Sequence, residues 1–265
     1  MMKSKALPVL HGANISPYVR KVRVALAYKG IEYSNTQQSP FNAPEEFVTK
    51  SPLSKIPCWE EGDLILPDSS VILSYLEYRY PDPPLLPAAA GPRARALWLE
   101  EYSDTKVGET VAGVFFQRVI MPTAFKQETD EQLVRHLLDS ALPKVFNYLA
   151  DCLGDEEFML GDEFSIADIA IASAFVNFTL AGETVDTDRW PELASYIQRV
   201  HALPCYAPIV KADLEGEFAR FRPKESHNVW SNLGSLESNC DRKFFSLWTC
   251  LSKRLTLFYA TILKY

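Results

Sequence analysis

The sequence has no excess of basic residues and no paired cysteines. Its 265 residues carry a formal net charge of −7 at pH 7, which argues against a nucleic-acid partner, because such partners are bound through a basic face. The five cysteines are odd in number, widely spaced and without any Cys-x-x-Cys pair (Cys58, Cys152, Cys205, Cys240 and Cys250). They predict free thiols in a reducing compartment and argue against a disulfide framework and a metal site.

Long uninterrupted apolar runs are also lacking. The first residues contain no apolar core of the signal-peptide kind. Two apolar blocks (residues 244–251 and 255–263) are separated by Ser252-Lys253-Arg254, whereas a transmembrane helix needs about 20 mostly apolar residues with few charges. A hydrophobic content of 47% still allows a sizeable core, so we expect a soluble cytoplasmic protein.

The first eighty residues alternate between strand and helix patterns. Short apolar segments predict strands at residues 7–12, 31–33, 56–59 and 64–66. Capping residues and helical spacing predict helices that open at Ser16-Pro17, Pro44 and Asp68-Ser69. The resulting order is β-α-β-α-β-β-α, with a parallel crossover in the first half and an antiparallel hairpin in the second.

Beyond residue 80 the pattern becomes helical. Five prolines between residues 81 and 92 exclude a helix or a central strand there and predict an interdomain linker. Helices are expected at about residues 93–120, 129–153, 165–180, 191–203 and 206–215, with a kink at Pro143 in the second. We therefore predict an α/β domain over residues 5–80 and an all-helical domain over residues 93–221.

One helix start in the second half is strongly specified. Ser165 is followed three residues later by Asp168, which is the spacing of a capping box. This pair predicts the first turn of a buried apolar helix, and its role is in folding.

Ser16 is the strongest candidate for a residue that takes part in chemistry. Serine is a preferred N-cap and proline a preferred first helical residue, so Ser16 is expected to open a helix at Pro17. Its hydroxyl then lies beside unpaired backbone N–H groups at the positive end of the helix dipole, which favours an anion such as a thiolate. Taken alone, the segment also fits a serine that only caps its own helix.

Two further segments fit a short extended peptide as ligand. Pro57 stands at the entry to a strand; if the Ile56–Pro57 bond is cis, the backbone N–H and C=O of Ile56 face outward and can pair with a peptide. At the start of the next helix, Ser69 and the backbone N–H groups suit a carboxylate, while Asp68 suits an ammonium group. The alternatives are a structural proline and an ordinary acidic helix start.

In this order the motifs resemble those of the cytosolic glutathione S-transferases of the serine type. The similar segments are residues 16–23, 51–57, 68–72 and 161–168, and the resemblance covers about residues 5–221. It implies a thioredoxin-like N-terminal domain, an all-α C-terminal domain and a homodimer. Glutathione is the implied co-substrate.

The resemblance also implies roles for single residues. Ser16 would donate its O–H to the glutathione sulfur and stabilise the thiolate. Ile56 would pair with the cysteinyl backbone of glutathione, and Pro57 would set that turn.

At the two ends of glutathione, Asp68 and Ser69 would hold the γ-glutamyl ammonium and carboxylate, and Lys55 would approach the glycyl carboxylate. The implied function is a detoxification transferase whose thiolate attacks a small hydrophobic electrophile, by conjugation, isomerisation or peroxide reduction. A serine in place of cysteine at position 16 argues against a glutathione-dependent reductase. The alternative is a non-catalytic binding or scaffold module of the same fold.

Other residues receive simpler interpretations. Cys58 is expected to be a buried small residue, and His11 and Asn14 to have capping or loop roles. The electrophile pocket stays open; apolar residues at helical spacing such as Val111, Val114 and Phe115 fit a core at least as well. The C-terminal tail (residues 222–265) breaks the pattern and is interpreted as an appended surface segment, with a weak membrane tether or a partner-binding helix as alternatives.

Overall fold

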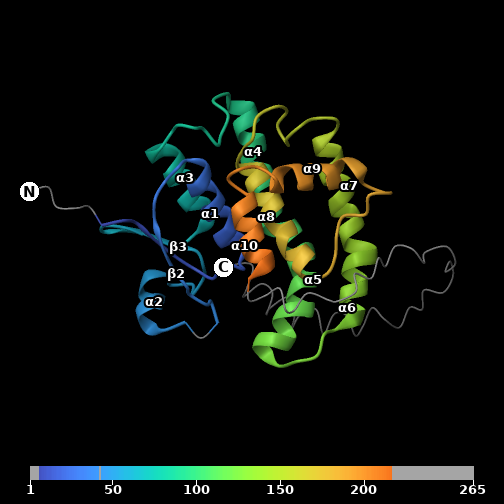
Figure 1. Ribbon diagram of the computed structural model, residues 1–265, viewed down its shortest axis with the longest axis horizontal. Coiled ribbons are helices and arrows are strands. Elements are labelled where there is room, and N and C mark those ends of the chain that lie inside the picture. The colour runs from blue at the N-terminus through green and yellow to red at the C-terminus, as the bar shows by residue number, and fades with distance from the viewer. Residues whose placement is uncertain (1–5, 42, 217–265) are drawn as a thin grey trace, which may run out of the picture.

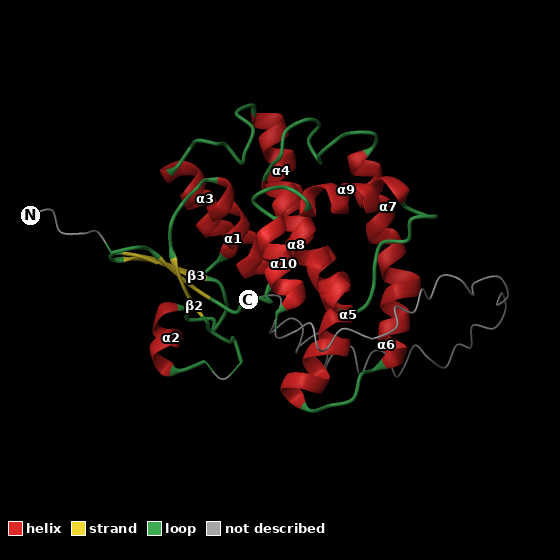
Figure 2. Ribbon diagram, in the orientation of Figure 1, coloured by secondary structure: helices red, strands yellow, loops and turns green. Residues whose placement is uncertain are grey.

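The computed structural model describes residues 6–41 and 43–216 (Figure 1). Its N-terminal part contains a four-stranded sheet in the order β2-β1-β3-β4, seen edge-on in Figure 2. The strands are β1 (Val9–His11), β2 (Ser34–Thr36), β3 (Cys58–Glu61) and β4 (Leu64–Leu66). β1 is parallel to β2 and antiparallel to β3, which forms a hairpin with β4.

Three helices complete this part of the fold. They are α1 (Pro17–Tyr28), α2 (Glu45–Lys50) and α3 (Ser69–Arg79), so the predicted order β-α-β-α-β-β-α is confirmed. α1 and α3 pack against each other, and their apolar residues share a buried core with the sheet (Leu10, Val19, Val22, Leu26, Trp59, Ile72 and Leu76). This is the thioredoxin-like arrangement that was predicted from the sequence.

Three strands begin later than predicted, and the strand predicted at residues 31–33 does not overlap the observed β2. β1 begins at Val9 instead of Leu7. β2 begins at Ser34 instead of Ile31, because the Ile31 N–H bonds back to the Leu26 carbonyl beyond Gly30, which has a φ of +65° and closes the helix. β3 begins at Cys58 instead of Ile56, because Pro57 has no N–H to contribute to a ladder.

The rest of the described chain is helical. Residues 90–125 form one continuous helical stretch made of α4 (Ala90–Tyr102), the π-helical η1 (Ser103–Ala112), α5 (Gly113–Phe115) and the π-helical η2 (Phe116–Phe125). It starts three residues before the predicted Arg93, because Pro92 falls in the first turn, where a missing N–H breaks no helical bond. It also continues past the predicted end at Ile120, with Pro122 inside η2.

Later helices follow the predicted positions closely. A second stretch consists of α6 (Glu131–His136), η3 (Leu137–Ala141) and α7 (Leu142–Leu153), so Pro143 lies in the first turn of α7, just after the π-helical segment. The others are α8 (Ile166–Leu180), α9 (Pro191–His201) and α10 (Ala207–Glu215).

The most central helix is α8 (Figure 1). Every residue of α8 except Thr179 is buried, and the helix packs against α1, α4, η1, α9 and α10. Its start confirms the predicted capping box: Ser165 is the N-cap, and the Asp168 side chain accepts a hydrogen bond from the Ser165 backbone N–H at 2.8 Å. α8 thus joins the helical part of the protein to α1 of the sheet-containing part.

Within residues 6–41 and 43–216 no helix is long and apolar enough to cross a membrane, and no group of His, Cys, Asp and Glu side chains could hold a metal ion. The predictions for the tail (residues 222–265) lie outside the described residues.

Candidate functional site

The turn between β1 and α1 presents Ser16. Ser16 is the N-cap of α1, with Pro17 as the first helical residue, so this prediction is confirmed. Its Oγ accepts a hydrogen bond from the Val19 backbone N–H at 3.4 Å, at the long end of the usual range. Because the cap bond uses a lone pair of the oxygen, the O–H proton remains available to a ligand.

The segment before β3 presents a backbone edge. The Ile56–Pro57 peptide bond is cis, and in the described part of the chain the N–H and C=O of Ile56 have no hydrogen-bond partner. Ser51 fixes the preceding loop, because its buried Oγ donates to the Lys55 carbonyl at 2.8 Å and accepts from the Lys55 N–H at 3.1 Å. An extended peptide can therefore pair with Ile56 without displacing another partner.

The start of α3 presents Asp68 and Ser69. Asp68 is an exposed N-cap whose Oδ1 accepts from the Val71 backbone N–H at 2.9 Å, and Ser69 is the buried first residue of the helix. Burial lowers the pKa of the Lys55 ammonium, and the Asp68 carboxylate opposes this by raising it. Lys55 and Asp68 are thus close enough to interact electrostatically.

Strand register brings the three segments together. His11, at the end of β1, is opposite Cys58 at the start of β3, and Leu66, at the end of β4, is opposite Trp59. The β1–α1 turn, the Ile56-Pro57 segment and the start of α3 therefore all leave the same edge of the sheet. Ser16, Lys55, Ile56, Pro57, Asp68 and Ser69 are gathered at this edge, while their individual roles stay predictions.

A buried ionic cluster fixes α1 against α3 and α4 below this edge. Lys21 is 1% exposed, and its ammonium lies 2.5 Å from Glu100 Oε1 and 2.5 Å from Asp104 Oδ2. It also donates to Ser70 Oγ at 3.3 Å, one residue after Ser69. Burial raises the pKa of Asp104 to about 6, although Lys21 lowers it. This cluster was not predicted from the sequence, in which its only signal is the dense basic pattern of residues 20–23.

Several other residues considered above are buried or bonded within the protein. Cys58 is fully buried, as predicted, and burial raises the pKa of its thiol to about 11. His11 Nε2 lies 3.0 Å from Glu60 Oε2. The three apolar candidates for an electrophile pocket named above lie in the large helical core.

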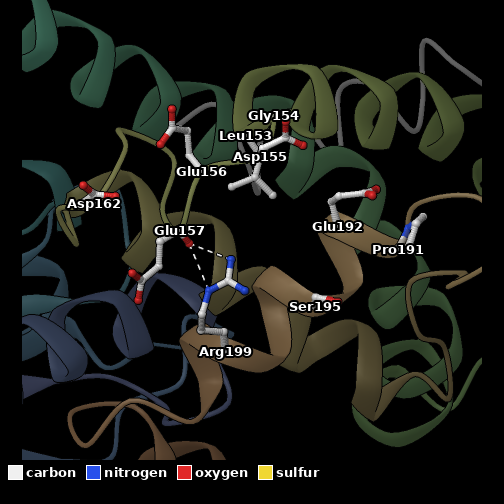
Figure 3. A pocket seen from close by; sticks show the side chains of 10 residues that line it. All are labelled: Leu153, Gly154, Asp155, Glu156, Glu157, Asp162, Pro191, Glu192, Ser195 and Arg199. Atoms are coloured by element: carbon white, nitrogen blue, oxygen red, sulfur yellow. Dashed lines mark hydrogen bonds between the residues drawn. The ribbon is translucent and has the colours of Figure 1, made fainter.

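A hollow lies away from this edge, between the end of α7, the loop that follows it, and α9 (Figure 3). It has a volume of about 640 Å³ and is lined by five carboxylate side chains (Asp155, Glu156, Glu157, Asp162 and Glu192). Arg199 donates two hydrogen bonds to the Glu157 backbone carbonyl, at 2.8 and 3.2 Å. The hollow contains none of the predicted site residues, and its acidic lining is unsuited to a ligand with two carboxylates.

Comparison with known proteins gives a consistent picture. Residues 10–84 match the model of the glutathione S-transferase N-terminal domain, and residues 116–207 match that of the C-terminal domain. The chain is 30% identical to the uncharacterized GST-like protein YibF of Escherichia coli, over 75% of this chain and 96% of that protein.

Two solved structures share the fold. A glutathione S-transferase from Rhodospirillum rubrum has a TM-score of 0.71 and 26% identity, over 77% of this chain and 91% of that one. A glutathione S-transferase from Methylobacterium radiotolerans, in complex with glutathione sulfonate, has a TM-score of 0.64 and 28% identity, over 77% of this chain and 94% of that one.

Proposed function

This chain belongs to the glutathione S-transferase family, and from that premise we propose that it is a serine-type glutathione transferase. It binds glutathione at the edge of the sheet and activates the thiol for attack on a small hydrophobic electrophile. One observation carries this proposal: Ser16, with an available O–H at the N-terminus of α1, shares a sheet edge with the Ile56 backbone and the start of α3.

The chemistry depends on ionising the thiol. A free thiol with a pKa near 8.5 is mostly protonated at neutral pH. At the proposed site, the Ser16 O–H and the first N–H groups of α1 stabilise the thiolate, so the proton leaves to solvent at a lower pH. In conjugation, the sulfur then forms a bond to an electrophilic carbon, and a leaving group departs or a double bond is saturated. Isomerisation and peroxide reduction use the same thiolate.

Binding roles follow the shape of the edge. The Ile56 backbone pairs with the cysteinyl unit in the turn set by Pro57, Asp68 and Ser69 hold the γ-glutamyl ammonium and carboxylate, and Lys55 approaches the glycyl carboxylate. The structure of the Methylobacterium relative with glutathione sulfonate supports glutathione as the ligand. We propose that this site belongs to a domain of residues 5–80 in a cytoplasmic protein. The linker that follows is shorter than predicted, because α4 begins at Ala90, and it leads into the helical domain.

Replacing Ser16 with alanine tests the thiolate step. We expect the thiol of glutathione bound to the unmodified protein to titrate roughly 1–2 pH units below its free value, and most of this shift to disappear in Ser16→Ala, because the hydroxyl donor is lost. The measurement is a pH titration of the ultraviolet absorbance of the bound thiolate. Ser165→Ala, which removes another N-cap serine far along the chain, is the matched control and should leave the thiol pKa unchanged.

The same titration separates the alternatives. Glutathione that binds with an unshifted thiol would support the non-catalytic binding or scaffold module. Absence of binding would contradict the proposed glutathione site altogether.

We also propose a homodimer, because exposed apolar side chains gather on adjacent elements. They lie on β4, α3 and α4 (Ile65, Val71, Tyr78, Leu97 and Trp98). Ser70 of α3 donates to Glu100 of α4 at 2.6 Å, so the first turn of α3 contacts α4. Exposed apolar patches on soluble proteins commonly mark interfaces.

The double substitution Val71→Asp and Leu97→Asp tests the dimer. Both side chains are more than two-fifths exposed, so the charges should not unfold the monomer, but they would lie in the proposed interface. Sedimentation or light scattering should give twice the chain mass of 29.9 kDa for the unmodified protein and the single mass for the variant. Leu7→Asp, at a half-exposed leucine outside this face, should remain dimeric; a monomeric unmodified protein would contradict the proposal.

A further inference from the structure

Asn177 of α8 reaches from the helical part of the protein to the turn that carries Ser16. Its side chain is fully buried, and its Nδ2 donates to the Ile15 backbone carbonyl at 3.0 Å. Its Oδ1 accepts from Arg20 Nη1 at 2.6 Å. A guanidinium group can only donate, so Arg20 fixes the orientation of the amide and directs its N–H2 group toward Ile15.

The peptide group held in this way is the one directly before Ser16. Its carbonyl edge, Ile15 O, accepts from Asn177 and, at 3.5 Å, from Arg20 Nη2. Its amide edge, Ser16 N, donates to the Ala13 carbonyl at 3.0 Å. Both edges of one peptide plane are therefore bonded, and rotation of this plane would break bonds on both sides. Since the plane sets the backbone orientation of Ser16, it also sets where the Oγ points.

A purely apolar contact would fill the same space without an amide. Burial of a polar amide is unfavourable unless its hydrogen bonds are satisfied, and here the described partners of both ends belong to the β1–α1 segment. The bond also crosses from α8 to the turn, so it fixes Ser16 relative to the helical part of the protein. This is a stronger constraint than local packing of α1 requires.

We propose that Asn177 is a positioning residue for Ser16, which holds the Ile15–Ser16 peptide so that the Ser16 hydroxyl meets the glutathione sulfur. This inference rests on the proposed function, because it has meaning only if Ser16 stabilises the thiolate. Loss of the Asn177 donor leaves the Ile15 carbonyl with the weaker 3.5 Å bond from Arg20, so the Ser16 hydroxyl can move away from the sulfur.

Two ion clusters lie on the elements that pack against α8. Arg20 and Arg23 of α1 with Asp213 of α10 form one, and Lys21 of α1 with Glu100 of α4 and Asp104 of η1 form the other. Because burial raises the pKa of Asp104 to about 6, the thiol titration of each variant is compared with that of the unmodified protein, in which Asp104 is also present. The neutral titratable neighbours are His201, whose pKa burial lowers to about 4, and Tyr206, whose pKa burial raises. Neither changes charge in the range where a bound thiol ionises.

Asn177→Asp is the decisive variant. It keeps an acceptor for Arg20 and loses the donor to Ile15, and the excess positive charge of Arg20 and Arg23 over Asp213 tolerates a second carboxylate. We expect the thiolate fraction of bound glutathione at pH 6.5 to fall roughly tenfold, which is a rise of about one unit in the thiol pKa. Affinity for S-methylglutathione, which has no thiol, should change less than about twofold, because the other binding contacts are untouched.

Ser173→Ala is the matched control. Ser173 lies one turn earlier on α8, and its Oγ bonds to the Tyr206 hydroxyl at 2.8 Å without contact to the turn. It should lose stability but keep the thiol pKa of the unmodified protein. Asn177→Leu removes donor and acceptor together and adds no charge, so it should also raise the thiol pKa. This neutral variant separates the lost hydrogen bond from the negative charge that Asn177→Asp adds, which by itself raises the pKa of a nearby thiol. A thiol pKa that rises in Asn177→Asp and stays unchanged in a folded Asn177→Leu would overturn the positioning role; should Asn177→Leu fail to fold, the neutral Asn177→Gln takes its place.

The outcomes separate the two proposals. A lowered thiol pKa that Ser16→Ala abolishes and Asn177→Asp leaves intact would overturn the positioning role and keep the proposed function. An equal rise in Ser173→Ala would also overturn it, since any loosening of α8 would then suffice. A bound thiol that is unshifted in the unmodified protein would overturn the proposed function, and the positioning role with it.

Discussion

Replacing Asp168 with alanine is expected to lower the free energy of unfolding by about 4 kcal/mol. The carboxylate is fully buried and accepts four hydrogen bonds, from the backbone N–H groups of Met159 and Ser165 and from the hydroxyls of Ser165 and Tyr196, at 2.8–2.9 Å. Alanine leaves these donors without an acceptor in the interior, and a buried unsatisfied donor costs roughly 1–3 kcal/mol. The total stays below the simple sum because both hydroxyls can reorient.

The loss should be visible as a drop in Tm of roughly 8–16 °C, since about 1 kcal/mol corresponds to 2–4 °C in a protein of this size. Ser165→Ala removes only the cap hydroxyl, whose Oγ accepts from the Ala167 N–H at 3.3 Å, and should cost about 1 kcal/mol. Asp130→Ala removes an exposed N-cap aspartate with two bonds at the start of α6 and should cost a similar amount. If Asp168→Ala melted no lower than these two, the buried carboxylate would not anchor α8.

Local sequence signals were enough to predict the caps and the order of the elements. Ser16, Asp68 and Ser165 each cap the helix expected of them, because capping depends on a few neighbouring residues. The starts of β2 and α4 were not predicted correctly. β2 begins late because the Ile31 N–H is bonded to the end of α1, and α4 begins early because Pro92 is tolerated in its first turn. Both effects depend on backbone geometry, which the amino-acid composition does not reveal.

The sheet edge could be predicted only in part. The three segments follow β1, precede β3 and follow β4, but their convergence depends on the pairs His11–Cys58 and Trp59–Leu66. Strands of three or four residues have too little pattern to specify register from sequence. The resemblance to a family supplied that information.

The buried charges were the feature that sequence analysis could not find. Basic residues on a helix are ordinarily solvent-exposed, yet Arg20 is 0% and Lys21 1% exposed. Their partners are distant in sequence, at Glu100 and Asp104 for Lys21 and at Asn177 and Asp213 for Arg20. No local pattern links residues separated by about eighty positions or more. These partners are what attach α1, and with it Ser16, to the helical part of the protein.

Replacing Asp213 with alanine is therefore expected to cost about 4 kcal/mol. Asp213 of α10 is buried, with Oδ2 2.7 Å from Arg20 Nε and Oδ1 2.9 Å from Arg23 Nη1. Alanine leaves two guanidinium groups in the interior without their carboxylate, and removal of one partner from a buried ion pair costs roughly 3–5 kcal/mol. Arg20 keeps the Ser173 carbonyl and Asn177 as acceptors, whereas among the described residues Arg23 keeps only a 3.4 Å contact with the Asn14 carbonyl.

Urea and thermal unfolding of Asp213→Ala measure this loss of stability directly. An exposed ion pair is the control, because its removal should cost much less. Lys106 and Glu109 form such a pair at 3.1 Å, with both side chains 53% exposed, so Glu109→Ala should change stability by less than about 0.5 kcal/mol. Asp213→Asn, which keeps the shape and one acceptor oxygen, should lose an amount of stability between those of Asp213→Ala and Glu109→Ala.

Loss of Asp213 should also make the amides of α10 exchange hydrogen faster than those of α8, because α10 contacts the rest of the protein mainly through α8 and α1. Equal stability of Asp213→Ala and Glu109→Ala would mean that α10 is held by its apolar contacts and that the two arginines find water or other acceptors once the carboxylate is gone.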